Sequence, residues 1–224
     1  MRGRTMKPNL QSRVLVGSVV VAITALACSS SSSGGGTDLP NGGGPQPDAF
    51  IAAEVGGGGG ACNLPSSDTA WLPVGTATAD KPTTVTNGGS TGSGTARITC
   101  TVHPSGNGFD IDLSVTVAGT PGGNVTISSP AGVGAVTTSG GTGITASFSS
   151  GTMGPYSASD CTLTFTYEGQ PVPVSPAVAA GRIWGHVDCP DATVAGQMTT
   201  GPDGGPTEVG CPAGADFLFE QCNQ

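Results

Sequence analysis

The sequence predicts an all-β fold, an antiparallel β-sandwich cross-linked by disulfides, with a small β-barrel as the alternative. Several short stretches after residue 61 alternate apolar and polar residues, which is the pattern of a strand with one buried face. Turns rich in Gly, Pro and Asn separate these stretches, as in antiparallel β proteins. The same region holds an even set of cysteines, which suits a disulfide framework.

The clearest strand lies at residues 109–117, where the odd positions are apolar and the even positions are Asp, Ser or Thr. The glycine-containing segment HPSGNG, residues 103–108, predicts a tight turn before it. Prolines in residues 170–181 predict an edge strand or an extended connection there. The remaining strands are expected at residues 98–102, 144–148, 161–167, 183–189 and 217–219, with weaker ones at 72–79 and 124–129.

The cysteines fit this arrangement. Cys161 and Cys189 share the parity of the apolar residues in their strands, so both are expected to face inward. They lie opposite each other if residues 160–167 and 182–189 form a hairpin. Six cysteines allow 15 pairings, so other sets stay open. The predicted pairs are Cys161–Cys189, Cys211–Cys222 and Cys62–Cys100.

The N-terminus has the features of a secretory signal peptide. Residues 1–13 include four basic residues and no acid, and residues 14–27 are apolar or small. The segment Thr24-Ala25-Leu26-Ala27-Cys28 resembles the lipobox of bacterial lipoproteins. This resemblance implies that residues 1–27 are removed and that Cys28 carries acyl chains such as palmitate, which anchor the protein in a membrane.

Two further observations bear on the fate of this cysteine. The chain has seven cysteines, so assigning Cys28 to lipid leaves six that can pair. Ser29 follows it, and the resemblance then implies the outer membrane, because an Asp there commonly retains lipoproteins at the inner membrane. Ala25-Leu26-Ala27 also matches an ordinary A-x-A cleavage site, which keeps a freely secreted protein as the alternative.

Residues 28–60 are rich in Ser, Gly and Pro, a composition that predicts a disordered tether behind the lipidated cysteine. The segment FIAAEV, residues 50–55, is its only apolar patch, and we expect it to be disordered as well. The expected organisation is a signal peptide at residues 1–27, a tether at residues 28–60 and a β-sandwich domain at residues 61–224.

The mature chain is strongly acidic. All fifteen acidic residues follow Cys28, whereas only Lys81, Arg97 and Arg182 remain as basic residues, which gives a net charge of about −12. Nucleic-acid binding requires a basic patch, so this charge excludes nucleic acid as a partner.

The sequence shows no convincing catalytic or metal-binding constellation, and we predict no cofactor. Residues 88–92 match G-x-S-x-G but lack the flanking strand and helix of a nucleophile elbow. The two histidines, His103 and His186, have no partner at metal-binding spacing. Asn107, Asp110 and Asp112 could offer oxygen atoms to calcium, without the spacing of an EF-hand.

The most distinctive stretch is GRIWGH, residues 181–186. Arg182, Trp184 and His186 are residue types common on recognition surfaces, although a strand could also use them to cover a small core. We therefore expect a non-enzymatic envelope lipoprotein that displays a tethered β domain for binding, adhesion or envelope assembly. An envelope protein or a glycan would be its partner. A secreted hydrolase of small substrates or polysaccharide is the alternative function.

Overall fold

The computed structural model describes residues 45–56, 62, 70–151, 153–200 and 206–224, all within a compact unit that runs from Gly43 to Gln224. The described part of the chain consists of strands and turns without a helix, which confirms the predicted all-β class. No helix there is long and apolar enough to cross a membrane.

The strands follow one another as short and long elements along the chain. In order, they are β1 (Asp48–Val55), β2 (Ala70–Val74), β3 (Val85–Thr86), β4 (Ser90–Thr91), β5 (Gly94–Ser105), β6 (Gly108–Ala118), β7 (Gly123–Ser128), β8 (Val136–Thr137), β9 (Gly140–Ser150), β10 (Met153–Thr164), β11 (Thr166–Tyr167), β12 (Gln170–Pro171), β13 (Val178–Ala179), β14 (Arg182–Thr200) and β15 (Pro206–Glu220).

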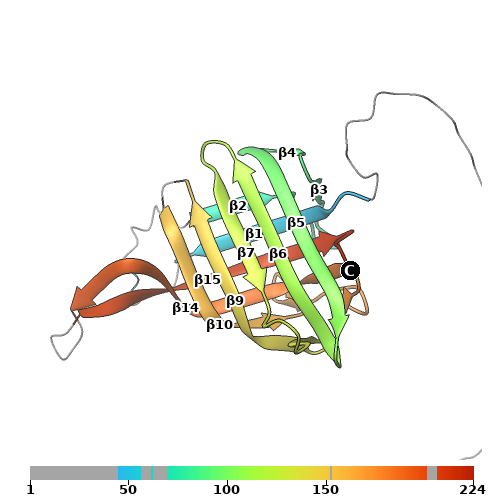
Figure 1. Cartoon of the computed structure of the whole chain (residues 1–224). Coiled ribbons are helices and arrows are strands. Elements are labelled where there is room, and N and C mark those ends of the chain that lie inside the picture. The colour runs from blue at the N-terminus through green and yellow to red at the C-terminus, as the bar shows by residue number, and fades with distance from the viewer. Residues whose placement is uncertain (1–44, 57–61, 63–69, 152, 201–205) are drawn as a thin grey trace, which may run out of the picture. The chain divides into compact units, whose positions relative to one another are not determined.

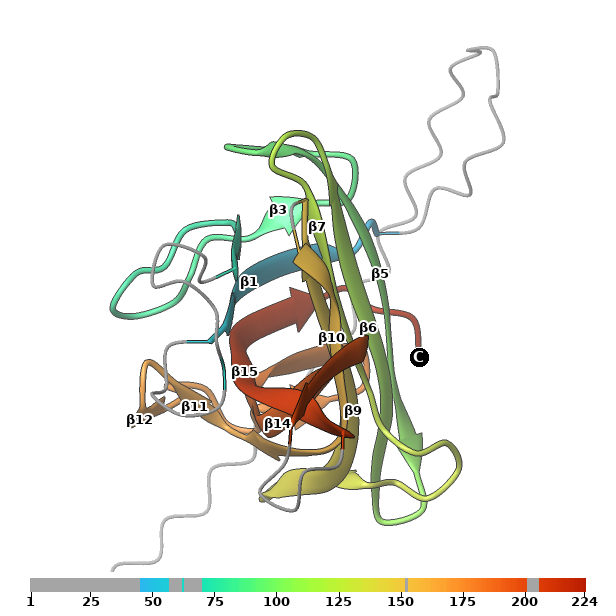
Figure 2. The same cartoon turned by 90° about the vertical axis from the view of Figure 1, so that its left-hand side faces the viewer.

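Most of these strands form one antiparallel sheet in the order β2-β1-β15-β14-β10-β9-β7-β6-β5-β4. The sheet folds back on itself, so that β5, β6, β7, β9 and β10 face β1, β2, β14 and β15 (Figures 1 and 2). The strands of the two layers cross steeply in Figure 1. This two-layer arrangement is the predicted sandwich, and β11 and β12 pair separately as a small hairpin.

One core fills the space between the two layers. It is built from the inward positions of the alternating strands, such as Ile111, Leu113 and Val115 of β6, all at most 3% exposed. Tyr156, Phe148, Phe217 and Phe219 are its largest residues, and many of the others are only Val, Ala or Cys. The predicted alternation at residues 109–117 is therefore confirmed from residue 111 onward, while Phe109 is only partly buried.

The turn predicted at residues 103–108 is shorter in the structure. His103 and Ser105 still belong to β5, and Gly108 already pairs with Ser105 at the start of β6. Gly106 sits at the turn with φ of 56°, a conformation that glycine adopts without steric cost. The proline-rich segment contains only the two-residue strands β12 and β13, as expected for an extended connection.

The prediction of disorder for residues 50–55 is wrong. These residues belong to β1, which pairs with β15 on one side and with β2 and β3 on the other. Ile51 and Val55 are at most 1% exposed in the main core, so the folded domain starts before the boundary predicted at residue 61. The prediction failed because Ser/Gly-rich flanks dominated the composition, whereas the apolar strand is stabilised by partners distant in sequence. Cys28 and the rest of residues 1–44 lie outside the described residues.

The structure contains three disulfides, and one of the three predicted pairs is confirmed. Cys161 and Cys189 are bonded and fully buried between β10 and β14. The other predicted pairs are wrong. Folding of the sheet brings the C-terminal segment beside β5, where Val102 donates a backbone hydrogen bond to Asn223. The pairs that differ from the prediction are Cys100–Cys222 and Cys62–Cys211.

Replacing both Cys100 and Cys222 with serine should destabilise the domain more than replacing Cys161 and Cys189. The first bond closes a sequence separation of 122 residues and the second only 28, which corresponds to about 5 and about 3.5 kcal/mol in the chain-entropy treatment. Calorimetry should show that each double variant melts about 10 °C or more below the wild type. The larger decrease is expected for the variant that lacks Cys100 and Cys222. Peptide mapping that recovers a Cys211–Cys222 bond would contradict this assignment.

A chain that begins at residue 61 should fail to fold, whereas a chain that begins at residue 45 should unfold cooperatively. Truncation at residue 61 removes β1 and with it the burial of Phe50, Ile51 and Val55. Each such side chain contributes about 1.5–3 kcal/mol, and their sum is comparable to the whole stability of an ordinary domain. Thermal melts followed by circular dichroism test both chains. Cooperative melting of the chain that begins at residue 61 would contradict the requirement for β1.

Candidate functional site

The outward face of β1, β15 and β14 carries the candidate site. These three strands lie side by side in one layer (Figure 2). Their odd-numbered residues point into the core, in β14 as far as Cys189. Their even-numbered residues therefore share the outer face. The registers align them in three rows across the strands. From the apolar to the acidic end, the rows are Phe50–Leu218–Trp184, Ala52–Asp216–His186 and Glu54–Gly214–Asp188.

The apolar row is covered by the β11–β12 hairpin and the segment that follows it. Tyr167, with Val172 and Val174, packs on Phe50 and Trp184 to form a second, smaller apolar cluster. The ring centroids of Tyr167 and Trp184 are 5.6 Å apart. The Tyr167 hydroxyl also accepts a hydrogen bond of 3.1 Å from the backbone N–H of Thr78. Tyr167 therefore links the loop around residue 78 to the outer face of the sheet.

The polar row contains a histidine paired with a carboxylate. His186 Nδ1 lies 2.9 Å from Asp216 Oδ1, and the histidine side chain is 35% exposed. The hydrogen bond to Asp216 raises the pKa of His186 above its ordinary value. Burial lowers the pKa, and the charges of Asp216, Asp188 and Glu54 raise it further. The imidazole therefore takes up a proton more readily than a free histidine side chain does.

Two adjoining cavities lie over these rows, and we call them together the outer groove. One, of about 290 Å³, lies between the β11–β12 turn and the loop containing Ala77. The other, of about 330 Å³, lies toward Asp188. Both are lined by Glu54, His186 and Gly214. A Cβ atom at Gly214 would lie 3.5 Å from the His186 ring and 3.0 Å from the Val187 carbonyl oxygen, so glycine leaves the imidazole room above the strand.

The structure separates the three residues that the sequence singled out. His186 lines the outer groove. Trp184 is 1% exposed and lies in the second apolar cluster, with its indole nitrogen buried and without a hydrogen-bond partner in the described part of the chain. Arg182 donates a hydrogen bond of 2.9 Å to the carbonyl oxygen of Pro176. The structure thus brings His186 to a cavity, and uses Trp184 and Arg182 in packing and loop attachment.

Sequence reasoning missed the acidic residues of the outer groove. Glu54 lies in a segment expected to be disordered, where only Ala53-Glu54-Val55 alternates apolar and polar residues. Asp216 precedes the pair Phe217 and Phe219, and its parity alone places it on the polar face. Both signals were present, but the alignment of Asp216 with His186 depends on the register of β14 and β15.

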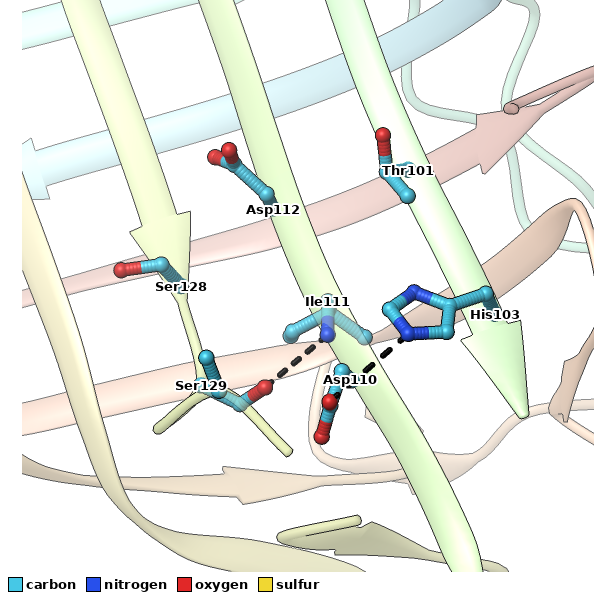
Figure 3. A pocket seen from close by; sticks show the side chains of 8 residues that line it. Thr101, His103, Asp110, Ile111, Asp112, Ser128 and Ser129 are labelled. Atoms are coloured by element: carbon cyan, nitrogen blue, oxygen red, sulfur yellow. Dashed lines mark hydrogen bonds and ion pairs between the residues drawn. The ribbon is translucent and has the colours of Figure 1, made fainter. Parts of the chain in front are cut away.

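A second pocket lies on the outward face of the opposite layer (Figure 3). It has a volume of about 390 Å³ and lies over β5, β6 and the end of β7. We call it the His103 pocket. His103 Nε2 lies 3.7 Å from Asp110 Oδ2, and Ser129 Oγ accepts a hydrogen bond from the N–H of Ile111. The remaining lining residues include Thr101, Asp112, Ser128 and Ala131.

Asp110 acts as the anchor of the loop that borders the His103 pocket. Its carboxylate accepts backbone hydrogen bonds of 2.6 Å from Gly132 and 2.9 Å from Gly134. Burial raises the pKa of Asp110, but these two bonds, with the Ser105 side chain and the charge of His103, bring it below its ordinary value. Both carboxylate oxygens are thus committed to the loop, and calcium binding is not favoured at this residue.

No family model, curated protein or solved structure matches this chain. Its class therefore rests on its own features, an all-β domain with three disulfides. Disulfides persist in oxidising compartments, so these bonds indicate an extracytoplasmic location.

The pair formed by His186 and Asp216 should make stability depend on pH. A histidine whose pKa is raised on folding stabilises the domain fully below its unfolded pKa near 6.5, and this contribution is lost as pH rises through the folded pKa. His186→Gln should therefore cost about 1 kcal/mol or less at pH 5, because the pair is partly exposed, and less at pH 9. Urea unfolding at both pH values measures the difference.

Asp216→Asn is the matched variant for this experiment, because it keeps a hydrogen-bonding side chain while removing the charge that faces His186. In that background, His186→Gln should lose most of its pH dependence. An equal cost at pH 5 and pH 9 in the wild type would contradict the electrostatic role of the pair.

Proposed function

We propose that this protein is a lipid-anchored, non-enzymatic binding protein of the bacterial cell envelope, with a β domain held at the outer membrane by Cys28. The observation that carries the proposal is the closure of the cysteine set. Six of the seven cysteines pair with one another, so Cys28 is left with no disulfide partner in its own chain. A lipobox-like segment precedes that cysteine, and lipidation gives it a role.

The distance between the anchor and the domain is consistent with display above a membrane. About 20 residues separate Cys28 from the first residue of β1, Asp48. Such a segment spans at most about 70 Å when fully extended. This length would let the domain stand clear of the lipid headgroups while remaining attached.

Binding is the activity that the geometry supports best. The outer groove combines a floor of small apolar groups with several convergent polar side chains, which is the usual make-up of a ligand site.

Metabolic labelling with an alkyne fatty acid should mark the wild-type protein and spare Cys28→Ala. The diacylglyceryl group is joined to the sulfur of this cysteine by a thioether, and a further acyl chain can be joined to its amino group by an amide. Two or more chains give stable membrane attachment. The labelled protein should partition with membranes, and the unlabelled variant should be released. Ser29→Ala is the control, because it changes the neighbouring residue without removing the thiol.

Retention of label on Cys28→Ala would overturn the anchor. If Cys28→Ala loses the label and also disappears from the cells, a blot of the culture medium shows whether the domain was released. The same comparison distinguishes a lipid anchor from the freely secreted alternative, in which the wild type carries no label.

A further inference from the structure

The end of the outer groove beside Tyr167 has an apolar interior. Ala52 and the backbone of Gly214 and Ala215 form its floor, and Phe50 and Tyr167 also line it. Phe50 is 2% and Tyr167 is 4% exposed, so both rings are held in place by packing. The volume of about 290 Å³ lies near the lower end of ordinary ligand pockets. A single extended side chain or a small molecule is thus the size of ligand that fits.

The rim of the same cavity is acidic and is supplied by three separate elements. Glu54 comes from β1, Asp216 from β15 and Glu168 from the turn after β11. Asp188 adds a further carboxylate at the adjoining end of the groove. His186 is the one basic side chain lining either cavity, and it pairs with Asp216. The groove therefore keeps an excess of negative charge.

The strong bases of the described domain are engaged or lie elsewhere. Lys81 pairs with Glu220 at 2.9 Å, and Arg182 bonds to the Pro176 carbonyl oxygen. Arg97 lies on β5, in the opposite layer. None of the three lines the outer groove, so a cation that neutralises it would come from outside the described domain.

Glu168 has a backbone conformation that a glutamate rarely adopts. Glu168 and Gly169 have φ values of 50° and 74° and form the two-residue turn between β11 and β12. Asn, Asp or Gly is the usual residue at the first position of such a turn. A glutamate there places a carboxylate at the cavity rim, where local preference would supply a shorter side chain.

From this combination, we propose that the outer groove binds a lysine side chain of a partner protein. The methylene groups would lie on the floor of Ala52, Gly214 and Ala215. The ammonium group has three N–H donors, which suits a rim with carboxylates on three elements. This inference deepens the proposed function, since it takes the domain to be a binding module.

The test uses the mature chain, residues 28–224, purified in mild detergent and followed by NMR chemical-shift titration. The probes are pentylamine, the uncharged pentan-1-ol, and an acetylated Gly-Lys-Gly amide with the lysine either free or Nε-acetylated. We expect the free-lysine peptide and pentylamine to bind about tenfold more tightly than their uncharged counterparts. Shifts should appear at Ala52, Gly214 and Ala215, and added salt should weaken binding.

Glu54→Gln and Glu168→Gln should each weaken binding of the free-lysine peptide about five- to tenfold. Both residues are exposed, so their replacement leaves the core intact, and a thermal melt confirms folding. Asp112→Asn is the matched control, because it removes an exposed carboxylate from the opposite layer and should leave the affinity unchanged.

Three outcomes would overturn the inference. These are equal binding of charged and uncharged probes, equal weakening by Asp112→Asn and Glu54→Gln, and binding of pentylamine without binding of the lysine peptide, which would indicate a free amine as the ligand. The lipid anchor is tested separately by labelling at Cys28. If Cys28 is labelled but lysine does not bind, the lipid anchor is retained and the lysine-binding inference is rejected. If lysine binds but Cys28 is not labelled, only the lipid anchor is rejected.

Discussion

The position of β15 is the constraint on which the rest of the structure depends. It pairs along its length with β14 on one side and, near its end, with β1 on the other. Cys211 within it is bonded to Cys62, and Cys222 just after it is bonded to Cys100 of β5. β15 thus fixes the positions of β1, β14 and the layer that contains β5 relative to one another.

This closure compensates for a core made of small side chains. Valine, alanine and cysteine occupy many of the inward positions, and each buries less apolar area than a leucine or an aromatic residue would. Disulfides that bridge long sequence separations restrict the unfolded chain and offset part of its conformational entropy. The disulfides therefore supply part of the folding stability that the small side chains of the core do not provide.

The same strands that close the core also build the outer groove. Each inward residue of β1, β15 and β14 alternates with an outward one, so the register that aligns Ala215 with Ala53 and Val187 also aligns Asp216 with Ala52 and His186. A shift of one residue in β14 would send His186 into the core and Val187 to the surface. The core thereby fixes the arrangement of charges at the groove.

The sequence by itself determined the class of fold, most strand positions, the inward parity of Cys161 and Cys189, and His186 as a residue of interest. These features follow from the two-residue period of a strand, which is a local property of the chain. Only the tertiary structure decided that residues 50–55 form β1, that Cys100 bonds to Cys222, and that Glu54 and Asp216 share a groove with His186. Such pairings join residues far apart in sequence, and they are selected by the free energy of the whole folded chain, which no local pattern contains.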